Sequence, residues 1–216
     1  LRIVHVEAGM RSHCWWSPFP EELSRRLVSR LAHFHMAPDE NARENLQSEK
    51  ITDKVFVTGG NTVVDALQLV LKNAEGPTAP YALANVHRFE NLNSSDRWHK
   101  IIDLLVAAAQ AHKIILVLMP PTAELLQKDL RSRQRLEAAG VELRPRLPFK
   151  EFALLLPGAQ FVLSDGGSNQ QECHYIGKPC LVLRTVTESM EGIGGSCVLA
   201  KFDPGIIRGF MEAPLA

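Results

Sequence analysis

The sequence has neither an excess of charge nor a long apolar stretch. Its 216 residues hold 24 Lys and Arg against 24 Asp and Glu, so the formal net charge is zero. This balance argues against a protein that binds nucleic acid through a large net positive charge. No apolar run approaches the about 18 residues that a membrane span requires, and the run at residues 114–119 has only the length of a strand. We therefore expect no nucleic-acid partner and no membrane partner.

Cysteine is scarce, and its spacing carries no motif. Cys14, Cys173, Cys180 and Cys197 form no CxxC pair and no zinc-ligand spacing. We interpret them as reduced thiols rather than as disulfides or metal ligands. Residues 1–6 have neither the length nor the small-residue cleavage site of a secretory leader. The sequence thus predicts a soluble cytoplasmic protein without a metal ion or other cofactor.

Short β-branched runs alternate with helical stretches along the chain. We expect strands at residues 2–6, 54–58, 81–87, 113–118, 141–144, 160–164, 179–183 and 197–200. We expect helices at 20–31, 39–47, 61–73, 94–111, 123–138 (which can break midway), 151–156, 168–176 and 204–211. This alternation predicts an α/β fold, a Rossmann-like parallel sheet with helices on both faces.

The composition changes at residues 73–80, where glycine and proline end a helix before a strand. We place the domain boundary just upstream, between residues 58 and 59. Residues 59–216 hold six expected strands and can form a complete doubly wound domain. Residues 1–58 hold only two expected strands, which are too few to form a core. We therefore expect this region to be the C-terminal remnant of an incomplete first domain. Such a remnant leaves sheet edges and apolar faces uncovered.

Two carboxylates mark the first candidate site. Glu7 follows the strand at 2–6, and Glu21 opens the helix at 20–31, with His5, Arg11 and Arg25 nearby. Carboxylates at strand and helix ends can act as general acid and base when their surroundings separate their pKa values. The alternative is a solvated helix N-terminus at which the acidic pair 21–22 complements the helix dipole.

Two further clusters follow later strands. His87 and Arg88 suit a phosphate or diphosphate, although a surface His–Arg pair is an equally good interpretation. Residues 164–172 read S-D-G-G-S-N-Q-Q-E and open a helix directly after a strand. Free N–H groups at such a turn form an anion site. One helical turn further on, the carboxylate of Glu172 could meet a ribose diol.

Seven sequence blocks together resemble a known family. The blocks occur in order along nearly the whole chain: HVEAGMRS, PFPEELSRR, APDENARENL, VFVTGGNTVVDAL, VHRFENL, FVLSDGGSNQQE and IGKPCLVLRTVTESMEG. They are similar to the non-hydrolysing UDP-N-acetylglucosamine 2-epimerases, which interconvert UDP-GlcNAc and UDP-ManNAc. The resemblance implies a GT-B architecture and a reaction that eliminates UDP and adds it back after C2 has changed configuration.

The resemblance also implies roles for residues. It makes Glu7, Glu21 and His87 catalytic, the first two as acid/base groups and the third near the diphosphate. The UDP contacts that it implies are those of residues 59–216, namely Arg88, Phe152, Gly166, Gly167, Ser168 and Glu172. Three positions depart from the family pattern, each with the loss of a positive or polar contact: Phe89, Met119 and Ser189.

The implied function is epimerisation of a UDP-sugar for cell-surface polysaccharide synthesis, by a protein that can form a homodimer. About 100 residues that family members carry before this region, some three βα units of roughly 30 residues, are absent here. We therefore expect impaired or no activity from this chain alone. A non-catalytic nucleotide-sugar-binding remnant and a GT-B glycosyltransferase are the alternatives. The paired Glu7 and Glu21 favour epimerisation over transfer.

Overall fold

The computed structural model describes residues 1–16, 19–72 and 80–214. The predicted turn at 73–79 and Pro18 of the PFPEE motif lie outside the described residues. The chain divides into two compact units, Leu1–Asp65 with Val186–Ser189, and Ala66–Thr185 with Met190–Ala216. Each unit is built on its own parallel sheet, so each is described by itself.

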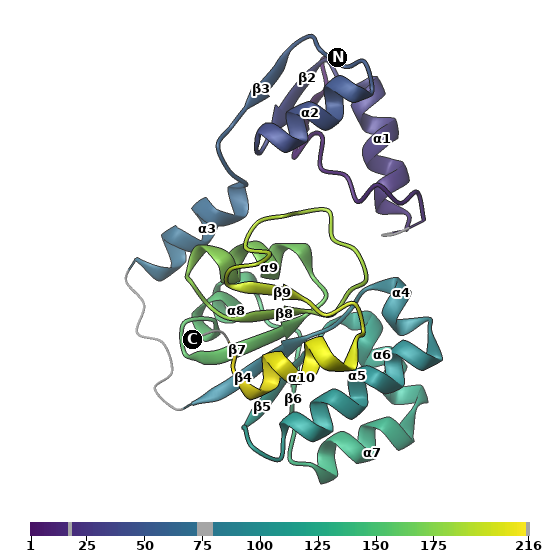
Figure 1. The fold of residues 1–216 in the computed structure, drawn as a ribbon, viewed down its shortest axis with the longest axis vertical. Coiled ribbons are helices and arrows are strands. Elements are labelled where there is room, and N and C mark those ends of the chain that lie inside the picture. The colour runs from purple at the N-terminus through teal and green to yellow at the C-terminus, as the bar shows by residue number, and fades with distance from the viewer. Residues whose placement is uncertain (17–18, 73–79, 215–216) are drawn as a thin grey trace. The chain divides into compact units, whose positions relative to one another are not determined.

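The first unit is a three-stranded parallel sheet with two helices. Strands β1 (Val4–Val6), β2 (Phe34–Ala37) and β3 (Val55–Val57) lie in the order β1-β2-β3. Helix α1 (Glu21–Leu31) joins β1 to β2, and α2 (Glu40–Ser48) joins β2 to β3 (Figure 1). The carboxylate of Asp39 caps α2 by accepting the N–H of Ala42 at 2.7 Å, as its sequence position predicts.

The prediction of two strands in this region was wrong, because β2 is a third. Its sequence F-H-M-A is short and has no β-branched residue, so Phe34 alone favours a strand and the signal is weak. The strand forms because it pairs with both neighbours. His35 is buried in it, with its Nε2 2.8 Å from the backbone oxygen of Ser29.

The first unit has a small apolar core and a large exposed apolar face. Its buried apolar cluster consists of Ala8, Ala37, Ala42 and Leu46. Leu23, Leu27 and Leu31 of α1 share a face as predicted, but they stay 46%, 59% and 60% exposed. The expectation of uncovered apolar faces is therefore confirmed, and polar interactions must supply much of the cohesion of this unit.

The second unit is a six-stranded parallel sheet in the order β6-β5-β4-β7-β8-β9, which confirms the six predicted strands. The strands are β4 (Tyr81–Asn85), β5 (Ile114–Leu118), β6 (Glu142–Pro145), β7 (Ala159–Ser164), β8 (Cys180–Val182) and β9 (Cys197–Leu199). The helices from α3 onward are α3 (Thr62–Leu71), α4 (Phe89–Leu92), α5 (Ser95–Ala108), α6 (Pro120–Lys128), α7 (Leu130–Ala138), α8 (Phe149–Leu155), α9 (Gly167–Tyr175) and α10 (Pro204–Glu212).

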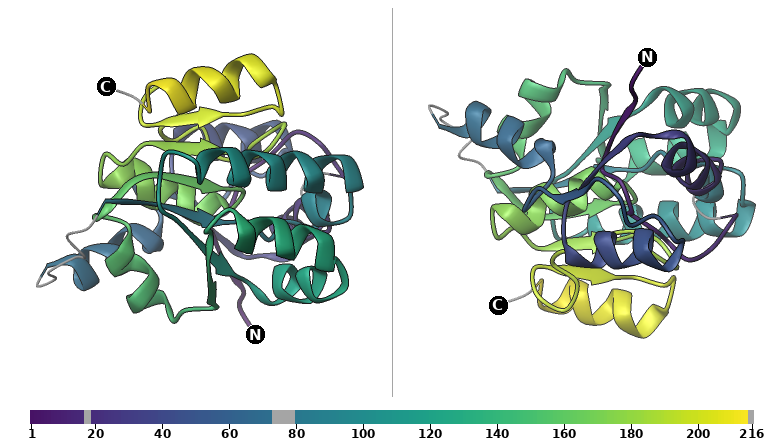
Figure 2. Two further views of the ribbon diagram at one scale, coloured as in Figure 1. Left: turned by 90° about the horizontal axis from the view of Figure 1, so that it is seen from below. Right: turned by 90° about the horizontal axis from the view of Figure 1, so that it is seen from above.

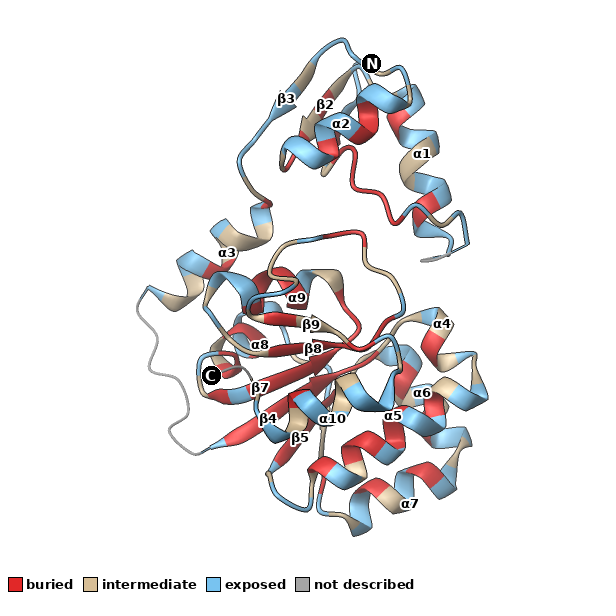
Figure 3. Ribbon diagram, in the orientation of Figure 1, coloured by how far each residue is buried: buried red, intermediate tan, exposed pale blue. Residues whose placement is uncertain are grey.

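Helices cover both faces of this sheet, as predicted (Figure 2). One apolar core cluster joins the sheet to α5, α6, α7 and α10, and the other joins it to α3, α8 and α9. Burial is therefore concentrated on the central strands (Figure 3). The predicted midway break separates α6 from α7 at Asp129, which accepts bonds from the N–H of Ser132 and from Trp98. The short helix α4 was not predicted.

The strand order creates a topological switch point. The chain runs outward from β4 through β5 to β6, then returns to β7 on the other side of β4 and continues to β8 and β9. The connections at the carboxyl ends of β4 and β7 therefore diverge and leave a crevice between them. Ligands of open α/β sheets bind in such a crevice.

Candidate functional site

A cavity of about 210 Å³ lies at this switch point of the second unit. Four of the predicted site residues line it: His87, Phe152, Ser168 and Glu172. The predicted residues Arg88, Gly166 and Gly167 are next to lining residues in the sequence. Its lining combines apolar and aromatic side chains with a few polar and charged groups, as small-molecule sites do. The residues that line it are Asn85, His87, Val117, Met119, Arg146, Leu147, Phe149, Phe152, Ser168, Asn169 and Glu172.

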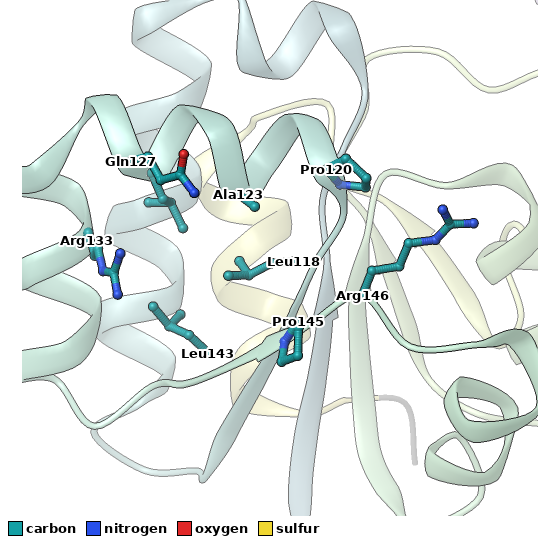
Figure 4. Close-up of a pocket in the computed structure, with 9 residues that line it drawn as sticks. Leu118, Pro120, Ala123, Gln127, Arg133, Leu143, Pro145 and Arg146 are labelled. Carbon is teal, nitrogen blue, oxygen red and sulfur yellow. The ribbon is translucent and has the colours of Figure 1, made fainter.

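A larger cavity of about 440 Å³ lies between α6, α7 and β6 (Figure 4). Leu118, Leu143 and two prolines make it mainly apolar, and Arg146 at its edge points away from these leucines in Figure 4. Among the described residues that line it there is no carboxylate, histidine or thiol. It therefore offers no acid or base, and the switch-point cavity is the better candidate site.

His87 is held by a carboxylate that the sequence analysis did not single out. Asp165 is fully buried at the end of β7 and accepts the backbone N–H groups of His87 and Arg88, both at 2.9 Å. Its carboxylate lies 3.4 Å from Nδ1 of His87. Arg88 also donates from Nε to the backbone oxygen of Asp165 at 3.3 Å. Asp165 thus ties the β4 loop to the β7 loop.

The turn before α9 is shaped by its neighbours. Ser164 accepts the N–H of Gly166 and donates to Oδ1 of Asn169, at 3.1 and 2.8 Å. A Cβ on Gly166 would lie 2.9 Å from that same Oδ1 and 3.2 Å from Cε1 of His87. Glycine is therefore needed here for close packing, and Gly167 and Ser168 form the first turn of the helix. The unbonded N–H groups of this turn suit an anion.

Glu172 lies on α9, facing the cavity, and is only 2% exposed. Asn169 donates to its Oε2 at 2.9 Å. Burial dominates and raises the pKa of Glu172 to about 7. The carboxyl group is therefore partly neutral near pH 7 and can both donate to and accept from a pair of hydroxyl groups.

The raised pKa of Glu172 predicts a pH-dependent stability. The folded protein holds this proton more tightly than the unfolded chain, so the stabilisation is complete below about pH 4.5 and is lost as the pH rises through about 7. The shift from 4.5 to about 7 amounts to at most about 3 kcal/mol. Glu172→Gln should therefore exceed the original protein in free energy of unfolding at about pH 8 and match it near pH 4.5.

Denaturant unfolding at the two pH values measures this effect. Glu151→Gln, at an exposed position of α8, is the matched control and should change the stability by less than about 0.5 kcal/mol at either pH. Equal stabilities of Glu172→Gln and the original protein at the higher pH would contradict the expected ionisation of Glu172.

The first unit holds the two other predicted carboxylates. Glu7 directly follows β1 and has a positive φ of 60°, a strained conformation for a residue with a side chain. The side-chain amide of Asn61 donates to its carboxylate. The next turn packs closely, because a Cβ on Gly9 would lie 2.0 Å from the backbone oxygen of Ala42. Glu21 is the first residue of α1 and is exposed.

Glu22 contradicts the solvated-terminus interpretation. Its side chain is fully buried, accepts the N–H of Ser12 at 3.1 Å and pairs with Arg26 at 2.8 Å. Arg26 also contacts Glu49, to which the buried Arg11 donates two bonds at 2.8 and 2.9 Å. This network fixes the loop after Glu7 to both helices.

His5 lies beside the network, with its Nδ1 3.2 Å from the hydroxyl of Ser29. Burial first, then the nearby charges of Arg11, His35 and Arg25, lower the pKa of His5 to about 4. His5 is therefore neutral at physiological pH and serves as packing rather than as an acid.

The described residues contain no group of three or more His, Cys, Asp or Glu side chains arranged to hold a metal ion. No helix among residues 1–16, 19–72 and 80–214 is long and apolar enough to cross a membrane.

The fold and cavity define an α/β protein with parallel sheets and a partly polar cavity at the switch point of the six-stranded sheet. The family described as UDP-N-acetylglucosamine 2-epimerase matches residues 1–210, and the chain belongs to this family. The predicted resemblance is therefore confirmed. Among curated relatives, the UDP-N-acetylglucosamine 2-epimerases of Salmonella borreze and Bacillus subtilis are 32% and 34% identical, over 95% and 94% of this chain.

Solved structures agree on the fold. The chain is similar to Methanocaldococcus jannaschii UDP-GlcNAc 2-epimerase in complex with UDP-GlcNAc and UDP, with a TM-score of 0.90 and 30% identity over 99% of this chain. It is also similar to the Neisseria meningitidis enzyme bound to UDP-GlcNAc, with a TM-score of 0.86 and 31% identity. The predicted α/β fold of GT-B type is thus confirmed.

The chain spans only part of its relatives. It covers 58% of the Salmonella borreze protein, 55% of the Bacillus subtilis protein and 62% of each of the two solved chains.

Proposed function

We propose that the complete protein interconverts UDP-GlcNAc and UDP-ManNAc by elimination and re-addition of UDP. The observation that carries the proposal is the cavity at the β4–β7 switch point, where His87, the turn before α9 and Glu172 meet. It lies in a chain similar to a structure solved with UDP-GlcNAc and UDP.

The second unit is the proposed nucleotide site. Phe152 and Phe149 offer flat apolar faces for a uracil, and Glu172 offers a carboxyl group for the ribose hydroxyls. The N–H groups of Gly167 and Ser168, with His87 and Arg88, supply donors for the diphosphate. We assign residues 59–216 to this UDP-binding domain and residues 1–58 to the first domain.

The first unit supplies the proposed acid and base. One of Glu7 and Glu21 takes the proton from C2 of the sugar as the bond from C1 to oxygen breaks and UDP leaves with its electron pair. The product is a 2-acetamidoglucal. Return of a proton to the opposite face of C2 and of UDP to C1 gives the epimer, with atoms and charge balanced. We propose that the enzyme is cytoplasmic and that the UDP-ManNAc it forms is used to synthesise cell-surface polysaccharides.

Epimerisation is tested on the complete encoded protein with UDP-GlcNAc in deuterated water. Removal and return of the C2 proton should yield UDP-ManNAc with deuterium at C2, observed by proton NMR. UDP-GlcNAc left unchanged and undeuterated would contradict the proposal. UDP binding without turnover would support the non-catalytic alternative, and sugar transfer to an acceptor would support a glycosyltransferase.

The nucleotide site is tested separately by calorimetry with UDP. His87→Ala and Glu172→Ala should each weaken UDP binding by about tenfold to a hundredfold, because each removes hydrogen bonds to the ligand and leaves the ligand's polar groups without their partners. His99→Ala, on the exposed side of α5, is the matched control and should bind UDP as the original protein does. Unchanged affinity in His87→Ala and Glu172→Ala would place the nucleotide elsewhere.

A further inference from the structure

Two acceptor groups face Nδ1 of His87. Oδ1 of Asn85 lies 3.1 Å from this nitrogen, and Oδ1 of Asp165 lies 3.4 Å from it. The orientation of Asn85 follows from its other bond, because its Nδ2 donates to the backbone oxygen of Val117 at 3.1 Å. The amide oxygen of Asn85, not its nitrogen, therefore faces the ring.

The carboxylate of Asp165 is fixed in place as an acceptor. It accepts the N–H groups of His87 and Arg88, and Nδ2 of Asn91 donates to it at 2.9 Å. Asp165 is fully buried and Asn85 is 4% exposed, so water competes little for these bonds. Because both neighbours of Nδ1 accept, the proton of the neutral ring belongs on Nδ1.

We propose that Asn85 and Asp165 are positioning residues that hold His87 as the Nδ1–H tautomer and make Nε2 the atom that exchanges protons in the cavity. A carboxylate behind a histidine fixes the ring's orientation and stabilises its charged form. The charged ring donates from Nε2 to an anionic ligand, and after losing that proton the neutral ring keeps the proton on Nδ1. The catalytic part of this inference rests on the proposed function, whereas the tautomer itself does not.

A purely structural role for Asp165 is the competing explanation. In that case the carboxylate only ties the β4 and β7 loops together, and its loss would lower stability without affecting the ring. The tautomer of His87 separates the two explanations, because tying the loops together does not require a proton on Nδ1.

The complete encoded protein, labelled with ¹⁵N-histidine, allows the tautomer to be read from long-range proton–nitrogen NMR spectra. Neutral His87 should show a protonated Nδ1 and an unprotonated Nε2. Asp165→Asn should move the proton of neutral His87 toward Nε2, because the new amide can present a donor to Nδ1. Asn85→Ala should do so more weakly, and it provides a second test if Asp165→Asn does not fold.

Kinetics supply the second readout. Asp165→Asn should lower kcat by about a hundredfold or more, as expected for a histidine held in the wrong tautomer, and should change KM much less. Asp129→Asn is the matched control. It lies at the N-cap of α7 in the same unit, where asparagine can still accept from Ser132, so it should change neither the tautomer nor kcat.

The outcomes are distinguishable from failure of the proposed function. A neutral His87 protonated on Nε2 in the original protein would overturn the inference, as would Asp165→Asn and Asn85→Ala variants that both keep the Nδ1–H tautomer. An Nδ1–H tautomer that shifts in Asp165→Asn supports the inference even if UDP-GlcNAc is not epimerised. In that event only the proposed function would fail.

Discussion

Glu7→Gln in the complete protein should lower kcat for C2 epimerisation by about a hundredfold to ten-thousandfold, the range for removal of a general acid or base. Glutamine keeps the size and hydrogen-bonding shape of the side chain, and it can still accept from Asn61. It cannot take a proton from carbon. The strained backbone at Glu7, with its φ of 60°, is consistent with a side chain held in place for chemistry.

Steady-state kinetics with UDP-GlcNAc measure this effect, and deuterium exchange at C2 reports on the proton transfer itself. Glu44→Gln, at an exposed position of α2 in the same unit, is the matched control and should retain full activity. A Glu7→Gln variant with more than about a tenth of the original kcat would remove Glu7 from the acid/base assignment. Glu21 would then be the candidate to test next.

Arg11→Met should destabilise the first unit by about 3–5 kcal/mol, the usual result of removing one partner of a buried ion pair. Arg11 is 3% exposed and donates to both carboxylate oxygens of Glu49, to the backbone oxygen of Met10 and to the hydroxyl of Ser29. The loss is severe here because the apolar cluster of this unit is small and consists mainly of alanines.

Hydrogen exchange of backbone amides in α1 and α2 measures the local stability of this unit. Arg43→Met is the matched control, because Arg43 pairs with Glu40 on the surface of α2 and both side chains are largely exposed. That pair should contribute less than about 1 kcal/mol. Equal effects of the two substitutions would show that the buried network does not hold the unit together.

The alternation of apolar runs determined the class of fold. Strands such as Ile114–Leu118, with helices between them, predict a parallel sheet, and the second unit has the six strands expected. Sequence blocks also determined the family. The motifs of His87 and Glu172 follow predicted strands, and in the structure both residues line one cavity. These features are local, because they depend on residue type and spacing within a few turns of chain.

Tertiary structure alone decided the rest. The strand F-H-M-A exists because two neighbours pair with it, and Glu22 is buried because Arg26 and the N–H of Ser12 come to meet it. Asp165 acquires its role from a loop that lies 78 positions away along the sequence. Pairing, ion-pair burial and the direction of a hydrogen bond depend on which distant segments become neighbours, and residue spacing along one segment carries no such information.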